Sequence, residues 1–379
     1  MQKHFQYTLF LQNEKALNSN IVLLDNPHFF DLLQEWKKVN KFGFDIETFS
    51  NIEEEGALNP QFGEIRLLSI AIPIKCGVKV LLIDLGFLPP ERERIYQQLI
   101  YLGFWELLSE RLANPTVEVI GHSLEFEQQW MLAKYGYKIR CVRDTKLMSQ
   151  VYWAGLDPWL DKANNKPHSL ASVCLRLGIE IDKTEQKSEW GWGDFGAGQL
   201  SNNQLNYAAY DSEVVLTVHQ RLEPLLKDIG VWHTYMAECA ASPAFAQMAH
   251  YGMPVNEMVL INVIQQYEAA YQDLVNKLGA TFPLAVSHLY STKELPKLIN
   301  AKFKLKLKQV NAETLSKYWE VSELRLISVI KTTKTYLDYL HNLLEALRDG
   351  YVRGSYTQIN RAAFGRSSCQ NPNLQNPPN

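Results

Sequence analysis

The chain has 379 residues, of which 46% are hydrophobic and 21% are charged, and its formal net charge is −3. This length and composition predict a globular protein with two domains and exclude a membrane-spanning chain, because no run of about eighteen apolar residues occurs. The five cysteines show no paired spacing, which excludes a disulfide framework and favours a reducing, cytoplasmic location.

Strand-like and helix-like segments alternate through the first part of the chain, which predicts an α/β layered domain. We expect strands at 42–46, 65–72, 78–85 and 117–121, with RIYQQLIYLGFWELLSERL forming one amphipathic helix between the last two. Further helices are expected at 123–135, 144–153, 168–177 and 201–226.

Beyond residue 230 the sequence predicts a mainly helical region. Helical patterns cover 233–251, 256–278 and 323–348, and the only strand-like run is KFKLKLK, around 303–308. A boundary near Lys227–Val231 gives domains at 1–228 and 229–379. Residues 291–379 carry 14 Lys+Arg against 7 Asp+Glu, an asymmetry expected either of a part that meets phosphates or of a solvated lysine-rich face.

The stretch KFGFDIETFS places two acids where a buried strand ends. Residues two apart in a strand point to the same face, so Asp45 and Glu47 can direct both carboxylates to one spot. Two solvated acids just past a strand are the alternative.

The stretch VIGHSLEFEQQWML turns from a strand through Gly121 into a helix. Leu124, Glu127 and Met131 share the inward face of that helix, whereas Glu125 projects roughly opposite. An unpaired buried carboxylate costs about several kcal/mol, so a cation or an arginine should accompany Glu127.

The stretch QLNYAAYDSEVVLTVHQRL places Tyr207 and Asp211 four residues apart, as neighbours on one helix face that is otherwise apolar. A tyrosine alone on this face would be interpreted as a residue that packs in the core. Packing does not explain an acid at position 211. Crowded carboxylates raise each other's pKa and destabilise a fold, and divalent ions remove this conflict. Magnesium prefers oxygen ligands, and two such ions about 4 Å apart can stabilise a phosphodiester displacement.

Together, DIET, GEIRLLSIAI, GHSLEFEQQWML and YAAYD resemble the three motifs of the DEDD-type 3′–5′ exonucleases. HSLASVCLRLGIEIDK and QKSEW are similar to the proofreading domain of family A DNA polymerases, the DNA polymerase I type, over about residues 40–226. The resemblance implies an α/β, RNase H-like three-layer domain with a mixed sheet, followed by a mainly helical partial polymerase region with thumb helices and the start of the palm.

The resemblance also implies two-metal hydrolysis at a single-stranded DNA 3′ end, with Mg²⁺, or Mn²⁺ in its place. Asp45 would bridge the two ions, Glu47 and Asp211 would complete the site that activates water, and Glu127 would hold the second ion. Tyr207, four residues before Asp211, implies the tyrosine subclass and would orient the attacking water; Asn206 occupies the position of the other subclass's histidine.

Two departures from the family pattern put full activity in doubt. Glu127 stands where aspartate is usual, and Ser123 stands where asparagine is usual. We still expect an active site, because all four carboxylates are present and glutamate can ligate magnesium.

GSYTQINRAAFGRSSCQNPNLQNPP resembles the family's entry into the palm, and an Asn- and Pro-rich disordered tail is the alternative. Arg366 matches an arginine that contacts the primer–template minor groove, and Gly365 with the 371–376 segment completes the motif; the DNA-binding candidates there are Asn371, Asn373 and Gln375. Between 188 and 198, Trp190, Trp192 and Phe195 are candidates either for stacking bases or for anchoring a loop.

No stretch resembles the polymerase's catalytic aspartate motifs, so we expect no DNA synthesis from this chain alone. The expectation is a truncated or split polymerase whose partner polypeptide supplies the missing palm and fingers. The leading hypothesis is a 3′–5′ DNA exonuclease for proofreading. A catalytically weak, DNA-holding half of a split polymerase and an RNA-trimming nuclease of the same fold are the alternatives.

Overall fold

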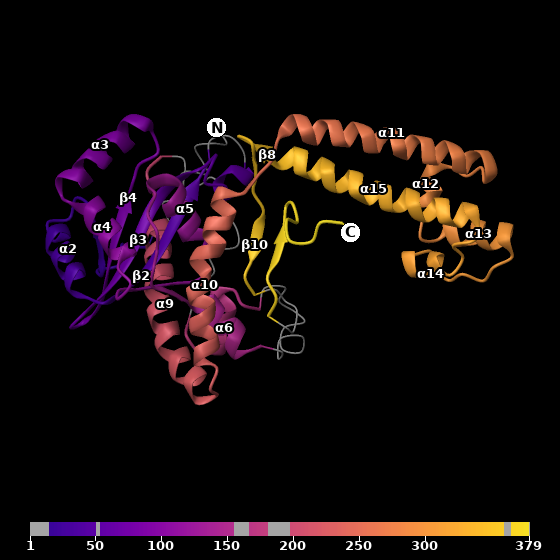
Figure 1. Cartoon of the computed structure of the whole chain (residues 1–379). Helices are drawn as coiled ribbons and strands as arrows, with labels where there is room; N and C mark the ends of the chain where they lie inside the picture. Colours follow the sequence, from indigo (N-terminus) through magenta and orange to yellow (C-terminus); the bar gives the residue numbers. More distant parts are fainter. Residues whose placement is uncertain (1–14, 51–53, 155–166, 181–197, 360–364, 379) are drawn as a thin grey trace, which may run out of the picture. The chain divides into compact units, whose positions relative to one another are not determined.

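The computed structural model describes residues 15–50, 54–154, 167–180, 198–359 and 365–378. The chain divides into two compact units, Met1–His250 with Gln358–Arg366, and Tyr251–Thr357 with Ser367–Asn379 (Figure 1). The functional division at residue 228 stays a prediction. The aromatic candidates Trp190, Trp192 and Phe195 lie outside the described residues.

A mixed six-stranded sheet, in the order β1-β4-β3-β2-β5-β6, forms the centre of the first unit. Its strands are β1 (Ile21–Leu23), β2 (Lys41–Phe49), β3 (Glu64–Ile74), β4 (Gly77–Asp84), β5 (Glu118–Gly121) and β6 (Val142–Asp144). β3 is antiparallel to β2 and β4, whereas β5 is parallel to β2 and β6, and β1 is parallel to β4. β3 is buried along most of its length, because both faces of the sheet are covered.

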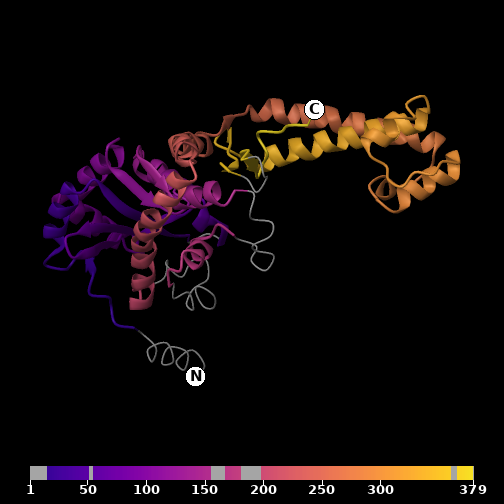
Figure 2. The same ribbon diagram turned by 90° about the horizontal axis from the view of Figure 1, so that it is seen from below.

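Helices cover both faces of this sheet, as Figure 2 shows. They are α2 (Phe29–Lys38), the 3₁₀ turn η2 (Glu54–Leu58), α3 (Pro89–Tyr101), α4 (Phe104–Ala113), α5 (Glu125–Tyr135), α6 (Thr145–Tyr152), α8 (Leu170–Arg176), α9 (Asn202–Asp228) and α10 (Trp232–Tyr251). Phe42, Phe44 and Ile46 of β2 join the larger core with Trp36 of α2, whose ring meets that of Phe42 edge-on at 5.3 Å. This core fixes one face of β2 and leaves the alternate residues for the other face.

The sequence predicted the four longer strands but missed β1 and β6, each of which has only three residues. The prediction of a single helix before β5 is wrong, because this segment forms two helices, α3 and α4. Gly103 separates them in the left-handed region with φ 68°. A residue in that conformation ends a helix, and glycine adopts it without steric cost.

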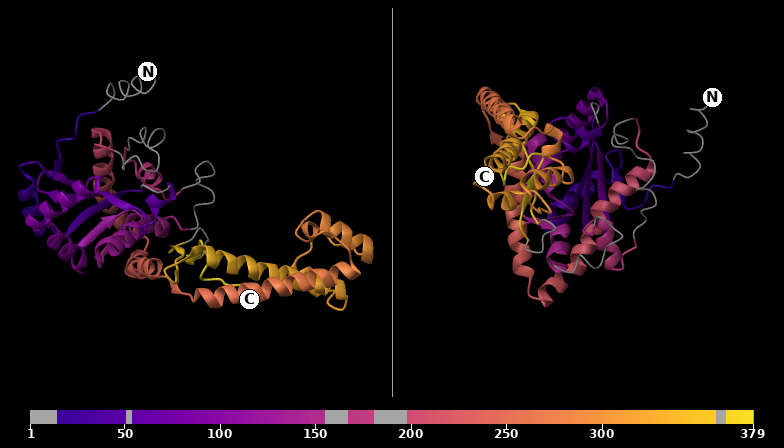
Figure 3. Two further views of the ribbon diagram at one scale, coloured as in Figure 1. Left: turned by 90° about the horizontal axis from the view of Figure 1, so that it is seen from above. Right: turned by 90° about the vertical axis from the view of Figure 1, so that its right-hand side faces the viewer.

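The second unit is mainly helical. Its elements are β7 (Met253–Pro254), α11 (Glu257–Thr281), α12 (Val286–Leu289), α13 (Glu294–Phe303), α14 (Ala312–Ser316), α15 (Ser322–Ala346), β8 (Leu347–Arg348), β9 (Tyr351–Val352), β10 (Ser355–Thr357) and β11 (Ser368–Gln370). α11 and α15 lie side by side (Figure 3), and the small helices close a core around Ile299 and Ile327. A mixed sheet with helices followed by a helical region is the predicted fold class, which is confirmed.

The strand-like KFKLKLK run is not a strand. Lys304 ends α13 in the left-handed region with φ 54°. The Asn300 side chain then brackets Leu307, donating to its carbonyl at 3.0 Å and accepting from its N–H at 2.8 Å. One amide therefore satisfies both backbone groups that a neighbouring strand would have paired.

No helix in the described part of the chain is long and apolar enough to cross a membrane.

Candidate active site

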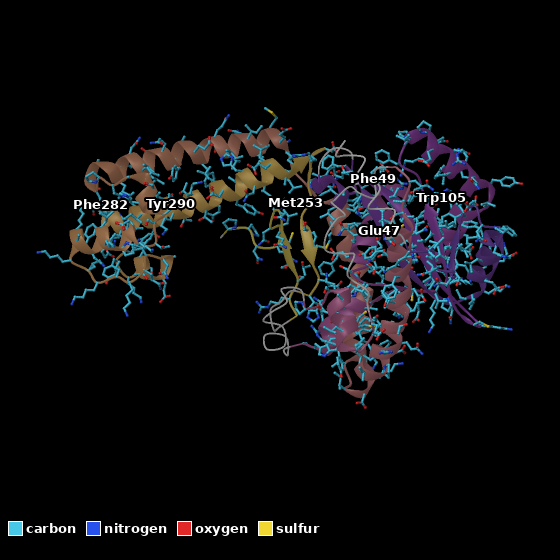
Figure 4. All side chains as sticks on the ribbon, turned by 180° about the vertical axis from the view of Figure 1, so that it is seen from behind. Glu47, Phe49, Trp105, Met253, Phe282 and Tyr290 are labelled. Carbon is cyan, nitrogen blue, oxygen red and sulfur yellow. The ribbon has the colours of Figure 1, made fainter. Side chains whose placement is uncertain are left out.

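β2 supplies the first two acids on the face that α9 covers. Gly43, Asp45 and Glu47 alternate with the core residues of this strand, so all three point to the same side. Asp45 pairs with Ser69 of β3, and the register shifts immediately after Glu47, between Glu47 and Thr48. Figure 4 labels Glu47 and Phe49 where β2 ends. Both acids are partly exposed.

α9 lies directly against this face. A Cβ atom on Gly43 would lie 1.9 Å from the carbonyl oxygen of Ser212, so only glycine allows the approach. Ser69 donates its hydroxyl to the Ala208 carbonyl at 2.9 Å and lies 2.7 Å from the Ser212 hydroxyl. The position of Asp211 relative to β2 is therefore set by backbone contacts and buried hydroxyl groups.

α9 carries the third motif on this packed face. Its start is fixed by a capping box, in which Ser201 and Gln204 satisfy each other's backbone N–H groups. Tyr207 and Asp211 follow one and two turns later, and their side chains are hydrogen-bonded. Burial and the nearby acids raise the pKa of Tyr207, so its hydroxyl keeps its proton.

α5 supplies the fourth acid from the end of β5. As predicted, Leu124 and Met131 are buried in the core and Glu127 between them is 4% exposed. The Glu127 Oε2 atom has no hydrogen-bond partner, and no salt bridge to this carboxylate forms among the described residues. Glu125, predicted to project away, is partly buried, and burial raises its pKa to about 7.

Two turns at this edge are joined by one buried carboxylate that the sequence analysis missed. Asp144 accepts from the backbone N–H groups of Ser123 at 3.0 Å, Leu124 at 2.8 Å and Lys146 at 2.7 Å. It thereby caps α6 and holds the turn that starts α5. Ser123 adopts φ 70° in that turn, a conformation that asparagine tolerates better than serine.

The acids form one electrostatic cluster. Burial is the largest cause that raises the pKa of Asp45, Glu47 and Glu127 well above their ordinary values. Repulsion adds to it: Asp211 raises the pKa of Asp45, and Asp45 raises that of Glu47 and of Glu127. Lys146 opposes this by lowering the pKa of Glu127, and it is the smallest of the causes that act on this carboxyl.

The donor set fits a hard divalent cation in its chemistry. All four candidates offer carboxylate oxygens, and the unpartnered Glu127 Oε2 is a buried acceptor that a cation would satisfy. Within the described ranges, no three Asp, Glu, His or Cys side chains lie close enough together to ligate one ion. The carboxylates would therefore have to move closer together to ligate a metal.

The side chain of Asn206, next to Tyr207, binds the segment before β1. Its side-chain amide donates to the Ala16 carbonyl at 3.0 Å and accepts from the Asn18 N–H at 2.9 Å. The residue at this position therefore holds the segment before β1 against α9, and Tyr207 is the residue of this turn that interacts with Asp211.

The C-terminal candidates lie near an antiparallel pair of short strands, β10 and β11. Four of them are exposed, namely Gly365, Arg366, Asn371 and Gln375. The fifth, Asn373, accepts from the backbone N–H groups of Gln375 at 3.1 Å and Asn376 at 3.0 Å, so its side chain shapes a turn. The described part of this tail is folded.

Gly43, Ser69 and Asp144 are the supporting residues that sequence reasoning missed. The small residues at 43 and 69 were visible on the β2 and β3 faces, but their contact with α9 depends on tertiary packing. Asp144 had a sequence signal, an acid before a helical pattern, which is typical of an N-cap.

Comparison with known proteins identifies the family of the first unit. A family model described as 3′–5′ exonuclease matches residues 22–227, more than half of the chain. DNA polymerase I of Aquifex aeolicus (strain VF5) is 28% identical over 284 residues, 68% of this chain and 46% of that protein, so the chain spans less than half the length of this relative.

Among solved structures, the POL domain of Pol1 from M. smegmatis, in complex with DNA primer-template and dNTP, matches with a TM-score of 0.64 at 19% identity. The match covers 93% of this chain and 55% of that one, and it supports the fold alone. Brucella melitensis NrnC with bound Mg²⁺ matches 61% of this chain and 92% of its own with a TM-score of 0.42 at 21% identity, too low to support an argument. The RNase H-like exonuclease fold predicted for the first unit is confirmed.

Proposed function

Because this chain belongs to the 3′–5′ exonuclease family of the DNA polymerase I type, we propose that residues 1–228 are a metal-dependent exonuclease that hydrolyses phosphodiester bonds at DNA 3′ ends. The observation that carries this is the charge cluster: Asp45, Glu47 and Glu127 all have raised pKa values, and no described arginine neutralises Glu127. Crowded carboxylates destabilise a fold unless cations bind to them.

In this proposal Asp45, Glu47, Glu127 and Asp211 hold two Mg²⁺ ions, for which Mn²⁺ can substitute. The bound ions supply charge stabilisation for the attacking and leaving oxygens. Tyr207 keeps its proton, so its hydroxyl orients the attacking water as a hydrogen-bonding group and does not act as a base. The hydrogen bond to Asp211 holds this hydroxyl in place.

Residues 229–379 are, in this proposal, the thumb helices and the start of the palm of a family A polymerase that acts in replication or repair in the cytoplasm. A complementary polypeptide would supply the remaining palm and fingers. Arg366, exposed beside β11, would contact the primer–template duplex together with Gly365, Asn371, Asn373 and Gln375.

The decisive experiment is digestion of 5′-labelled single-stranded DNA by the purified full chain with Mg²⁺ or Mn²⁺. Stepwise shortening from the 3′ end is expected, and it should disappear in Asp45→Ala and on addition of EDTA. Shortening that persists in Asp45→Ala would come from a contaminant and would count against the proposal. Arg366→Ala should weaken binding to a primer–template duplex and leave single-strand digestion unchanged.

A catalytically weak, DNA-holding half of a polymerase is the second candidate. Two observations favour it: glutamate occupies position 127, and no three described acids are close enough to ligate one ion. A wild-type chain that binds DNA but leaves it undigested with either metal would establish this candidate in place of the first.

A further inference from the structure

Lys146 lies at the sheet edge that carries the acids. β5 and β6 are parallel neighbours, and the turns that follow them are joined by Asp144. Lys146, in the first turn of α6, reaches across and donates through Nζ to the Ser123 hydroxyl at 3.0 Å. Its side chain stays partly exposed. A positive charge is thereby fixed beside the turn that starts α5.

The ammonium group of Lys146 forms no ion pair within the described part of the chain. None of the salt bridges formed by the described residues includes Lys146, whereas other cations of this unit are paired, such as Lys134 with Glu64 at 3.0 Å and Arg143 with Glu118 at 2.8 Å. An ammonium group has three donors, and the Ser123 hydroxyl takes one of them. Donors therefore remain for a ligand at the solvent-facing side.

The surrounding charge indicates which ligand this is. The charge of Lys146 acts on Glu125, Glu127 and Asp144, three acids of the same edge. A DNA phosphate that enters such an acidic region is repelled except where a cation receives it. A lysine held by a neutral hydroxyl, with no ion pair among the described residues, can receive that phosphate.

Building on the proposed exonuclease function, we propose that Lys146 binds a phosphate of the single DNA strand that enters the site. The residue binds substrate and does not take part in the chemical step. Its loss should therefore raise KM and leave kcat nearly unchanged. Loss of Lys146 should also make DNA binding less dependent on salt concentration, because one fewer phosphate contact releases fewer counterions.

The test uses the full chain and a 5′-labelled trinucleotide, a single strand that offers no duplex to the proposed primer–template contacts. Initial rates are measured with Mg²⁺ over a range of KCl concentrations for wild type, Lys146→Gln and Lys146→Arg. Glutamine can keep the hydrogen bond to Ser123 but has no charge. We expect Lys146→Gln to raise KM about tenfold and to make the slope of log(kcat/KM) against log[KCl] less negative by about 0.7. Lys146→Arg should stay near wild type in both.

Lys138→Gln is the matched control, because Lys138 is exposed and lies beyond the other end of α5. Its KM and salt slope should equal those of wild type. An unchanged KM and slope in Lys146→Gln would overturn the inference while wild-type digestion keeps the proposed function. A lower kcat with an unchanged slope would also overturn it, because Lys146 would then only position Glu127. Absence of digestion in wild type would instead reject the proposed function.

Discussion

Gly43 in β2 and Ser212 in α9 approach so closely that a methyl group on Gly43 would lie 1.9 Å from the Ser212 carbonyl oxygen. This contact places the strand that carries Asp45 against the helix that carries Asp211. It involves backbone on both sides, so neither partner can move aside as a flexible side chain would.

Gly43→Ala should therefore push α9 away from the sheet. We expect a loss of stability of about 1–3 kcal/mol or more, as for other overpacked cores, and a loss of DNA digestion of at least about 100-fold. Urea unfolding and the labelled-DNA assay measure the two effects. Gly279→Ala is the control, because nothing lies within 4 Å of its Cβ position and its activity should be unchanged. Full activity in Gly43→Ala would contradict the assigned role of this contact.

The raised pKa values predict how pH acts on the metal-free protein. The folded pKa values of Asp45, Glu47 and Glu127 lie above the unfolded values of about 4, so the folded state binds more protons above that pH. Their contribution to stability is therefore present at low pH and is lost as pH rises through the folded values. In EDTA, Asp45→Asn should raise the Tm at pH 8 by about 2–4 °C and flatten its fall between pH 5 and 8.

Magnesium should reverse the same penalty. Adding Mg²⁺ at pH 8 should raise the Tm of wild type and leave Asp45→Asn nearly unchanged, because the variant offers one carboxylate fewer. Equal Tm profiles of wild type and variant in EDTA would show that burial and repulsion of these carboxylates do not destabilise the protein.

Tyr207→Phe separates the hydroxyl from the ring. The ring's packing remains, while the hydrogen bond to Asp211 is lost. If the hydroxyl orients water, kcat should fall by about 100-fold with little change in KM or Tm. Tyr210→Phe is a matched control on the same helix, since the Tyr210 hydroxyl donates to the Glu180 carbonyl at 2.7 Å. Equal kcat values for the two variants would remove Tyr207 from the mechanism.

Ser123 offers a stabilising substitution. Its φ of 70° is costly for serine and well tolerated by asparagine. Ser123→Asn should therefore raise stability by about 0.5 kcal/mol, measured by urea unfolding, without loss of activity. A decrease would mean that the bond from Lys146 to the serine hydroxyl outweighs the backbone strain.

Asp144 should be among the most sensitive positions away from the proposed ligands. Asp144→Ala leaves the N–H groups of Ser123, Leu124 and Lys146 without their acceptor, and we expect a loss of about 2–4 kcal/mol. Asp144→Asn keeps one acceptor oxygen and should lose less. Thermal unfolding of the two variants measures the difference, and equal losses would argue that the carboxylate acts through charge alone.

Local spacing made part of this arrangement predictable. Tyr207 and Asp211 are neighbours because helical geometry alone places residues four apart on one face. The burial of Glu127 followed from its position between Leu124 and Met131 in the same way. Both inferences need only the chain's own periodicity.

What could not be predicted depends on contacts between distant segments. The approach of Ser212 to Gly43 spans most of the first unit, and nothing in either local pattern specifies it. β1 and β6 are too short to show an alternation, so only their neighbours β4 and β5 identify them. The strand predicted for the KFKLKLK run is wrong for a similar reason. Its residues do alternate, but the side chain of Asn300, and not a neighbouring strand, pairs the backbone of Leu307.

Asn300 also limits how this chain can associate with other molecules. The unpaired backbone groups of an extended run form an open sheet edge, on which strands of other chains can assemble. Here Leu305 and Leu307 pack onto the core, the backbone of Leu307 is already satisfied, and Lys304, Lys306 and Lys308 are exposed. The backbone groups of Leu307 are thus not available to a strand of another chain, because a single amide side chain already pairs them.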